Sequence, residues 1–148
     1  MEKLEIKDNF LYISDEASDF QVQLEAIDIA CTDRFVINLK LYDGKQAYLH
    51  PDSIKDSSEF DELVKLLTSH KKFFQCDGYM VINLENLQEC SVCKEKNEWG
   101  YYNLKMRFKR MIGGLASKDI DSLIKVRNAI LEAKQKYEET ITDDLIKG

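Results

Sequence analysis

Four cysteines and two histidines are the residues of this chain that could hold a metal or carry out redox chemistry. Cys90 and Cys93 form a Cys-x-x-Cys motif, and Cys76 with His50 or His70 could complete the four ligands of a zinc site. Structural zinc sites usually bring two closely spaced ligand pairs, however, and this chain has one. Residues three apart on a strand also point to opposite faces. We therefore expect no cofactor and no metal, with Cys76, Cys90 and Cys93 as weak candidates.

No catalytic arrangement is recognisable in the sequence. A redox-active Cys-x-x-Cys pair needs a helix N-terminus that lowers the thiol pKa, but Cys90 and Cys93 lie between strand-like residues and a charged turn. Neither histidine has a nucleophile in a recognisable setting. The pair Gly113-Gly114 lacks the further glycines and the Lys-Ser/Thr pair of a phosphate-binding loop. We therefore predict a protein that is not an enzyme, and an enzyme with an unrecognised site is a third possibility.

The segment 101–110 has the strongest local charge pattern of the chain. Its residues alternate, so a strand here would turn Leu104, Met106 and Phe108 inward. Such a strand could bind nucleic acid or an acidic partner through its solvent-facing side, or that side could simply be solvated. The solvent-facing side would carry a tyrosine and a row of basic residues: Tyr101, Lys105, Arg107 and Lys109, followed by Arg110.

The last helical segment, predicted from Ser117 to about Tyr137, has an apolar face that covers roughly half of its circumference. Arg127 and Lys134 fall within this face, where each must reach the rim or meet a carboxylate, because unpaired burial of a charge is costly. A partner or subunit interface is the alternative. We expect the residues from Glu138 onwards to fray. The apolar face consists of Ile120, Leu123, Ile124, Val126, Ile130, Leu131, Ala133 and Tyr137.

The periodicity of the remaining chain predicts an α+β protein of antiparallel β-meanders with two helices. Strands fill residues 10–50, and after Ala26 the apolar positions change parity, which indicates a bulge or a strand buried on both faces. Helical spacing begins at Ser58 and predicts a helix over about 58–70. Strands then resume until Gly113-Gly114, which we expect to break the chain.

Three pairs of segments resemble each other in the same order, which indicates an internal repeat of residues 10–70 in residues 73–140. A unit of about sixty residues buries too little apolar surface to be comfortably stable. We therefore expect a pseudo-two-fold tandem of β(3-4)-α units that share one core within a single domain, 1–148. The pairs are Phe10–Ser14 with Tyr79–Asn83, Val36–Leu41 with Tyr101–Met106, and Ser57–Leu66 with Ser117–Val126.

The repeated unit is similar to pleckstrin-homology-like domains and to small flagellar or phage accessory domains. The resemblance lies in an aromatic-x-x-Ile-Asn segment at Tyr79–Asn83, in Leu87, and in the meander and short helix that follow. It implies a binding scaffold without chemistry of its own.

Composition limits the function further. The formal net charge of −6 disfavours non-specific attraction to nucleic acid and is compatible with a protein partner that carries a basic surface. The charged N-terminus lacks a signal peptide, and no apolar run reaches the ~20 residues of a membrane span. We therefore expect a cytoplasmic protein with reduced cysteines.

The sequence as a whole predicts a small acidic protein that binds another protein. It would act as an accessory factor or an inhibitor, of the kind that phages or mobile elements encode, and a homodimer is compatible with this interpretation. A nucleic-acid-binding module that uses the basic strand 101–110 is the alternative. The predicted partner-binding residues are Tyr101, Lys105, Arg107, Lys109, Arg127 and Lys134.

Overall fold

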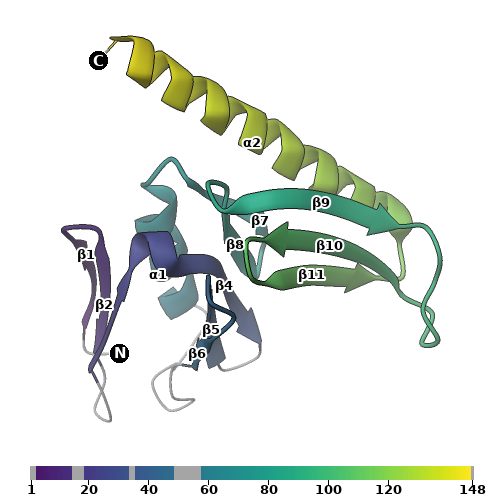
Figure 1. Cartoon of the computed structure of the whole chain (residues 1–148). Helices are drawn as coiled ribbons and strands as arrows, with labels where there is room; N and C mark the ends of the chain where they lie inside the picture. Colours follow the sequence, from purple (N-terminus) through teal and green to yellow (C-terminus); the bar gives the residue numbers. More distant parts are fainter. Residues whose placement is uncertain (1–2, 15–18, 34–35, 49–57, 148) are drawn as a thin grey trace. The chain divides into compact units, whose positions relative to one another are not determined.

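The structure, a computed structural model, describes residues 3–14, 19–33, 36–48 and 58–147. These residues form two α-helices and antiparallel sheets, which confirms the α+β class (Figure 1). The chain divides into two compact units, Met1–Asn83 and Leu84–Gly148. Within the described residues, the first unit contains one α-helix and two sheets, and the second unit contains one α-helix and one sheet.

The first unit contains two antiparallel sheets and helix α1 (Ser58–Thr68). A three-stranded sheet has the order β1-β2-β3, and a five-stranded sheet has the order β6-β5-β4-β8-β7. A short 3-10 turn, Leu24–Ala26, connects the sheets between β3 and β4. The strands are β1 (Lys3–Lys7), β2 (Phe10–Ser14), β3 (Asp19–Gln23), β4 (Ile27–Asp33), β5 (Val36–Leu41), β6 (Gln46–Tyr48), β7 (Phe73–Asp77) and β8 (Met80–Asn83).

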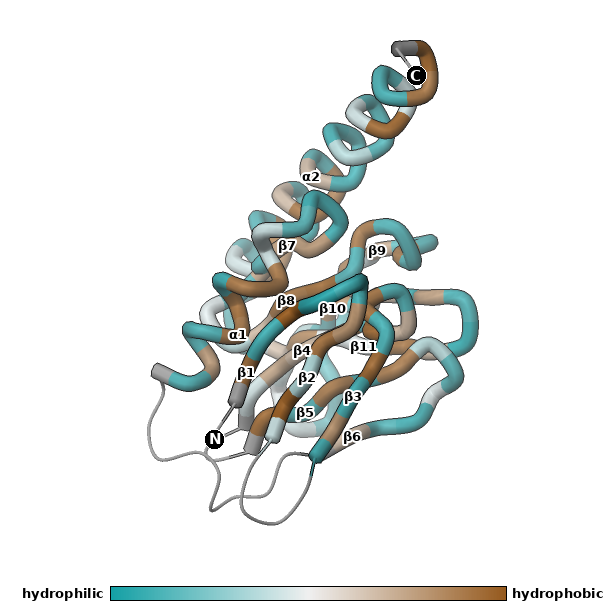
Figure 2. The backbone as a smooth tube through the Cα atoms, turned by 90° about the vertical axis from the view of Figure 1, so that its left-hand side faces the viewer, coloured by the Kyte–Doolittle hydropathy of each residue, from teal (hydrophilic) through white to brown (hydrophobic). Residues whose placement is uncertain are grey.

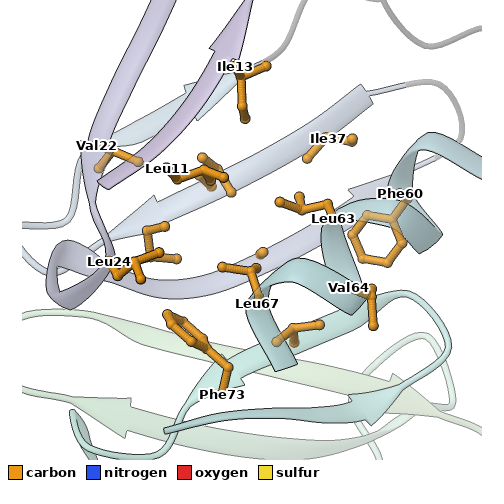
Figure 3. Close-up of a cluster of buried hydrophobic side chains, with 14 residues drawn as sticks. Leu11, Ile13, Val22, Leu24, Ile37, Phe60, Leu63, Val64, Leu67 and Phe73 are labelled. Carbon is orange, nitrogen blue, oxygen red and sulfur yellow. The ribbon is translucent and has the colours of Figure 1, made fainter. Parts of the chain in front are cut away.

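The core of the first unit lies where α1 meets the strands (Figure 3). The helix buries one face at the spacing i, i+3, i+4, i+7, as its sequence predicts. Leucines, valines and isoleucines from both sheets complete the cluster. Its members include Phe60, Leu63, Val64 and Leu67 of α1, Leu11 and Ile13 of β2, Val22 of β3, Ile37 of β5 and Phe73 of β7.

The parity change after Ala26 has both of the predicted causes. The register between β4 and β5 shifts between Ile27 and Ile29, which marks a bulge or a similar irregularity. Strand β4 is also buried on both faces, because Ile27, Asp28, Ile29 and Ala30 are all buried. The strand lies between β5 and β8, so both of its edges are paired.

The second unit is a three-stranded antiparallel sheet with the order β11-β10-β9, covered on one face by helix α2. The strands are β9 (Leu87–Cys93), β10 (Tyr102–Phe108) and β11 (Ile112–Ser117), and α2 runs over Ile120–Lys147. Figure 2 shows hydrophobic residues recurring along α2 up to its last turns. Among the described residues, no helix combines the length and the apolar composition that crossing a membrane requires.

Two predictions about this unit are wrong. Gly113-Gly114 does not break the chain but lies inside β11, where a Cβ atom at Gly114 would collide with the carbonyl oxygen of Leu104. The glycine is therefore required by close contact between strands. Helix α2 does not end near Tyr137 but continues to Lys147, and an ion pair between Lys134 and Glu138 lies along its later turns.

A three-stranded meander followed by a helix occurs twice along the described elements, as β4-β5-β6 with α1 and as β9-β10-β11 with α2. The strands that precede the two meanders differ, because β1-β2-β3 form a three-stranded sheet whereas β7-β8 form a hairpin. The boundary between the units nevertheless falls after Asn83, inside the predicted second half, because β8 pairs with β4 of the first sheet. The internal repeat and the shared core stay predictions, which superposition of residues 10–70 on residues 73–140 would test.

Candidate binding surface

Strand β10 has the alternation that its sequence predicts. Leu104, Met106 and Phe108 are buried beneath α2, whereas Lys105 and Arg107 are exposed on the opposite side of the sheet. Cross-strand neighbours extend this side across all three strands, because residues directly opposite each other point to the same face. We call this side the outer face; it consists of Glu89, Ser91 and Cys93 of β9, Asn103, Lys105 and Arg107 of β10, and Ile112, Gly114 and Ala116 of β11.

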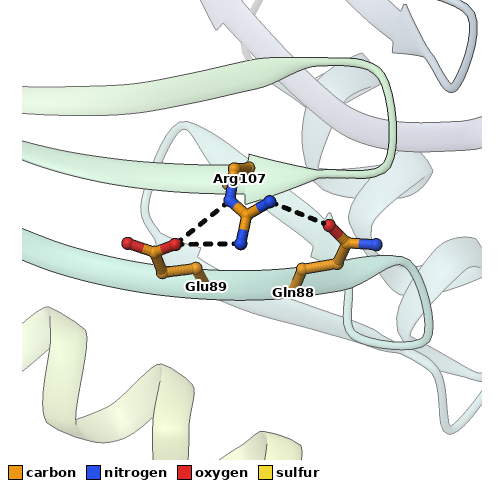
Figure 4. Close-up of polar contacts among 3 residues, drawn as sticks. All are labelled: Gln88, Glu89 and Arg107. Atoms are coloured by element: carbon orange, nitrogen blue, oxygen red, sulfur yellow. Dashed lines mark hydrogen bonds and ion pairs between the residues drawn. The ribbon is translucent and has the colours of Figure 1, made fainter.

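The charge of Arg107 is matched within the outer face. Its Nη2 lies 3.0 Å from Oε2 of Glu89, and its Nε donates a hydrogen bond of 3.1 Å to the same oxygen (Figure 4). Nη1 contacts the amide oxygen of Gln88 at 3.4 Å. An ion pair this exposed contributes at most about 1 kcal/mol to stability. Its main effect is to hold the guanidinium in place and to reduce the basic character of the predicted stripe.

The other members of the stripe are separated from one another. Lys105 is exposed between Ser91 and Gly114, whereas Lys109 lies past the end of β10. Tyr101 precedes β10 and is 36% exposed, and the ammonium of Lys118 lies 5.5 Å from the centre of its ring. The structure thus places Lys105 and Arg107 on the outer face, whereas Tyr101 lies just before β10 and Lys109 just after it.

The hairpin loop between β9 and β10 carries a functional candidate that the sequence analysis missed. Trp99, the one tryptophan of the chain, is 72% exposed at this loop. The side chain of Asn97 accepts hydrogen bonds of 3.0 Å from the backbone N–H groups of both Trp99 and Tyr101. Gly100 supplies the positive φ of 83° that the turn needs. A lone tryptophan beside a glycine, within a polar turn, was the available signal.

The two partner-binding candidates on α2, Arg127 and Lys134, have partners within the second unit. Nζ of Lys134 donates a hydrogen bond of 2.5 Å to the carbonyl oxygen of Leu84 and lies 3.5 Å from a carboxylate oxygen of Glu138. Arg127 contacts the side chain of Asn128 at 3.2 and 3.3 Å. Lys134 therefore meets a carboxylate and also ties the helix to the start of the unit. Neither residue extends the outer face.

Tyr137 adds a second contact near that start. Burial raises the pKa of its phenol, and the nearby carboxylate of Glu85, which also shares a hydrogen bond with it, raises the pKa further. The protonated phenol can donate this hydrogen bond at neutral pH. Together with the bond from Lys134 to Leu84, it positions α2 against its own unit.

The weak metal candidates are not brought together. Cys90 is buried on the α2 side of β9 and Cys93 is exposed on the outer face, as residues three apart on a strand should be. Cys76 belongs to the first unit, where its sulfur lies 3.7 Å from the carbonyl oxygen of Met80. His50 lies outside the described residues. Within the described ranges, no three His, Cys, Asp or Glu side chains are grouped so that they could hold a metal ion.

The two cysteines of the motif should differ sharply in reactivity. Burial raises the pKa of Cys90 to about 11, an effect that the positive charge of Arg127 only partly offsets. At pH 8 about one Cys90 thiol in a thousand is ionised, and the thiolate is the reactive form. We expect iodoacetamide to label Cys93 at pH 8 while Cys90 stays unmodified, as peptide mass spectrometry would show. Equal labelling in the folded protein would contradict the burial of Cys90.

One hollow in the described surface bears on the enzyme possibility. It has a volume of about 330 Å³ and is lined by β2 and β3 residues. Its one described carboxylate, Asp19, accepts a hydrogen bond of 2.6 Å from the hydroxyl of Ser14. An acid-base site would need converging carboxylates or histidines. This hollow brings one carboxylate, held by a neighbouring serine.

No family matches the sequence, and no curated protein matches it. Among solved structures, the chain is similar to the LytTr DNA-binding domain of a methyl-accepting/DNA response regulator from Bacillus cereus. The similarity has a TM-score of 0.45 and 8% sequence identity, and it covers 81% of this chain and 97% of that chain.

Proposed function

We propose that this chain is a cytoplasmic, non-catalytic protein that binds another protein, as an accessory factor or an inhibitor. The contact surface consists of Trp99, Tyr101 and the outer face of the second unit. The observation that carries the proposal is the exposed Trp99 on a turn held by Asn97 and Gly100. Because the turn is ordered in advance, an incoming partner need not order it, and less conformational entropy is lost on binding.

The composition of this surface supports a protein partner. Tryptophan, tyrosine and arginine are the residues most enriched where protein interfaces concentrate their binding energy. The surface offers Trp99, Tyr101 and an Arg107 that Glu89 and Gln88 already orient. Small residues beside Lys105, namely Ser91 and Gly114, leave the sheet flat enough for close approach.

The charge distribution is compatible with the same proposal. Residues 84–148 contain 11 acidic and 12 basic side chains, so the whole net negative charge of the chain belongs to residues 1–83. The ion pair between Arg107 and Glu89 lowers the positive potential that a phosphate backbone would seek. A mixed, nearly neutral surface with aromatic anchors is typical of a protein interface.

The test is affinity capture from the native host with matched variants. Trp99→Ala should weaken retention of the partner about 30-fold, which corresponds to the ~2 kcal/mol loss of an interface anchor. Leu145→Ala is the control, because Leu145 is also a large exposed hydrophobic residue of the second unit but lies near the end of α2, outside the apolar face of that helix. Quantitative mass spectrometry would measure retention. A partner held equally by wild type and Trp99→Ala would refute the proposed surface.

Nucleic-acid binding is the second candidate, favoured by cations that lie over aromatic rings near Trp99. The ammonium of Lys96 lies 5.5 Å from the ring centre of Tyr102, and Lys118 lies at the same distance from Tyr101. Bases could stack on such rings while lysines contact phosphates. Titration of single-stranded DNA and RNA, monitored by Trp99 fluorescence, separates the candidates. Affinity that falls steeply with salt would favour this one, and no affinity would remove it.

A further inference from the structure

Strand β11 is an edge of its sheet with none of the usual protection against further pairing. Among the described strands it is hydrogen-bonded to β10 alone, so its other edge carries unpaired backbone groups. Its six residues, Ile-Gly-Gly-Leu-Ala-Ser, include no charge and no proline. Its register against β10 runs without a shift from end to end. Natural edge strands normally carry lysine, proline or a bulge to prevent such pairing.

The opposite edge of the same sheet differs in these respects. Strand β9 carries Glu89, which is paired with Arg107, and its register against β10 shifts between Arg107 and Phe108. A second strand added there would meet a charged side chain and an irregular ladder. The open side of this sheet is therefore β11.

We propose that β11 pairs antiparallel with β11 of a second copy of this chain, which joins two sheets into one of six strands. Two identical strands can pair about a two-fold axis only when residues that share a face meet. A register centred on Gly114 satisfies this condition. It sets Ile112 of one copy beside Ala116 of the other, on the outer face and twice per dimer.

The side chains of β11 favour a second copy as the occupant. Ile112 is 60% exposed, and Gly114 and Ala116 are exposed beside it. Pairing in this register would cover each Ile112 with the methyl group of the partner's Ala116. Because β11 contains no charged residue, two copies meet within the strand without like-charge repulsion. The inference uses the backbone edge of β11 and does not depend on the function proposed above.

The test is the oligomeric state of the full chain, measured by size exclusion with light scattering between about 1 and 100 µM. We expect wild type to reach twice the monomer mass as concentration rises. The double variant Ile112→Lys, Ala116→Lys should remain monomeric at about 100 µM, because four lysines would crowd the shared edge. Hydrogen exchange should show β11 amides protected at high concentration and less protected on dilution.

A matched double variant distinguishes an effect at the β11 edge from a general effect of added charge on the outer face. Ser91→Lys, Cys93→Lys adds the same charge to the outer face but on β9, two strands away from β11. It should dimerise like wild type. Circular dichroism of all three proteins checks that they fold. A wild type that stays monomeric at about 100 µM, or a dimer that the edge lysines leave intact, would overturn the proposal.

Discussion

Phe108→Ala is expected to destabilise the second unit by about 3–5 kcal/mol, the usual cost of removing a buried aromatic ring. Phe108 is 1% exposed and belongs to the buried side of β10, with Leu104 and Met106. The described part of this unit has two layers, the three-stranded sheet and α2. No third layer can therefore move into the cavity that the missing ring would leave. The cavity should therefore remain largely open, and its walls should lose their dispersion contacts.

Urea denaturation followed by circular dichroism at 222 nm would measure this loss, because α2 accounts for much of the helical signal. Trp99→Ala is the control, since it also removes a large aromatic side chain from the second unit. Trp99 is mostly exposed, so its truncation should change the free energy of unfolding by no more than about 0.5 kcal/mol. Similar losses for both variants would contradict the assignment of Phe108 to the core.

Gly114→Ala is expected to have the second largest effect, about 3 kcal/mol, at the upper end of the cost of overpacking. A Cβ atom at this position would collide with the carbonyl oxygen of Leu104 on the neighbouring strand. The obstacle is backbone, which cannot swing away as a flexible side chain could. Relief requires β11 to move away from β10, which would weaken several hydrogen bonds of the ladder.

Gly78→Ala provides the comparison for this prediction. Gly78 lies in the turn between β7 and β8, and a Cβ atom there would meet no atom within 4 Å. Its substitution should leave the midpoint of urea denaturation nearly unchanged, whereas Gly114→Ala should lower it clearly. If Gly114→Ala is as stable as wild type, the close approach of β11 to β10 is wrong.

The side-chain pattern of single elements was predictable because it depends on residues close together in the sequence. Alternation assigned Leu104, Met106 and Phe108 to the buried face of a strand, and the spacing of Phe60 and Leu63 assigned the inner face of α1. The opposite orientations of Cys90 and Cys93 followed from the same period of two. These inferences required no knowledge of which strands pair.

The properties of the candidate surface were less predictable because they depend on partners distant in the sequence. The positive charge of Arg107 is offset by the carboxylate of Glu89, and only the register between β9 and β10 places these two residues opposite each other. The position of Lys134 within the apolar face of α2 does not reveal its partner, and only the fold places its ammonium against the carbonyl oxygen of Leu84. Gly113-Gly114 suggested a break because close contact between two backbones leaves no periodic signal in the sequence.

The sequence by itself determined the α+β class, which face of each strand and helix is buried, and that Cys90 and Cys93 point to opposite sides of their strand. Hydrophobic periodicity reveals these features because it depends on residues only a few positions apart. Only the tertiary structure decided that β8 completes the first sheet, that Glu89 neutralises Arg107, and that Trp99 stands exposed. Which distant strands pair depends on the total burial and hydrogen bonding of the whole unit. These totals come from contacts between residues far apart in the sequence, which a local pattern of residue types does not reveal.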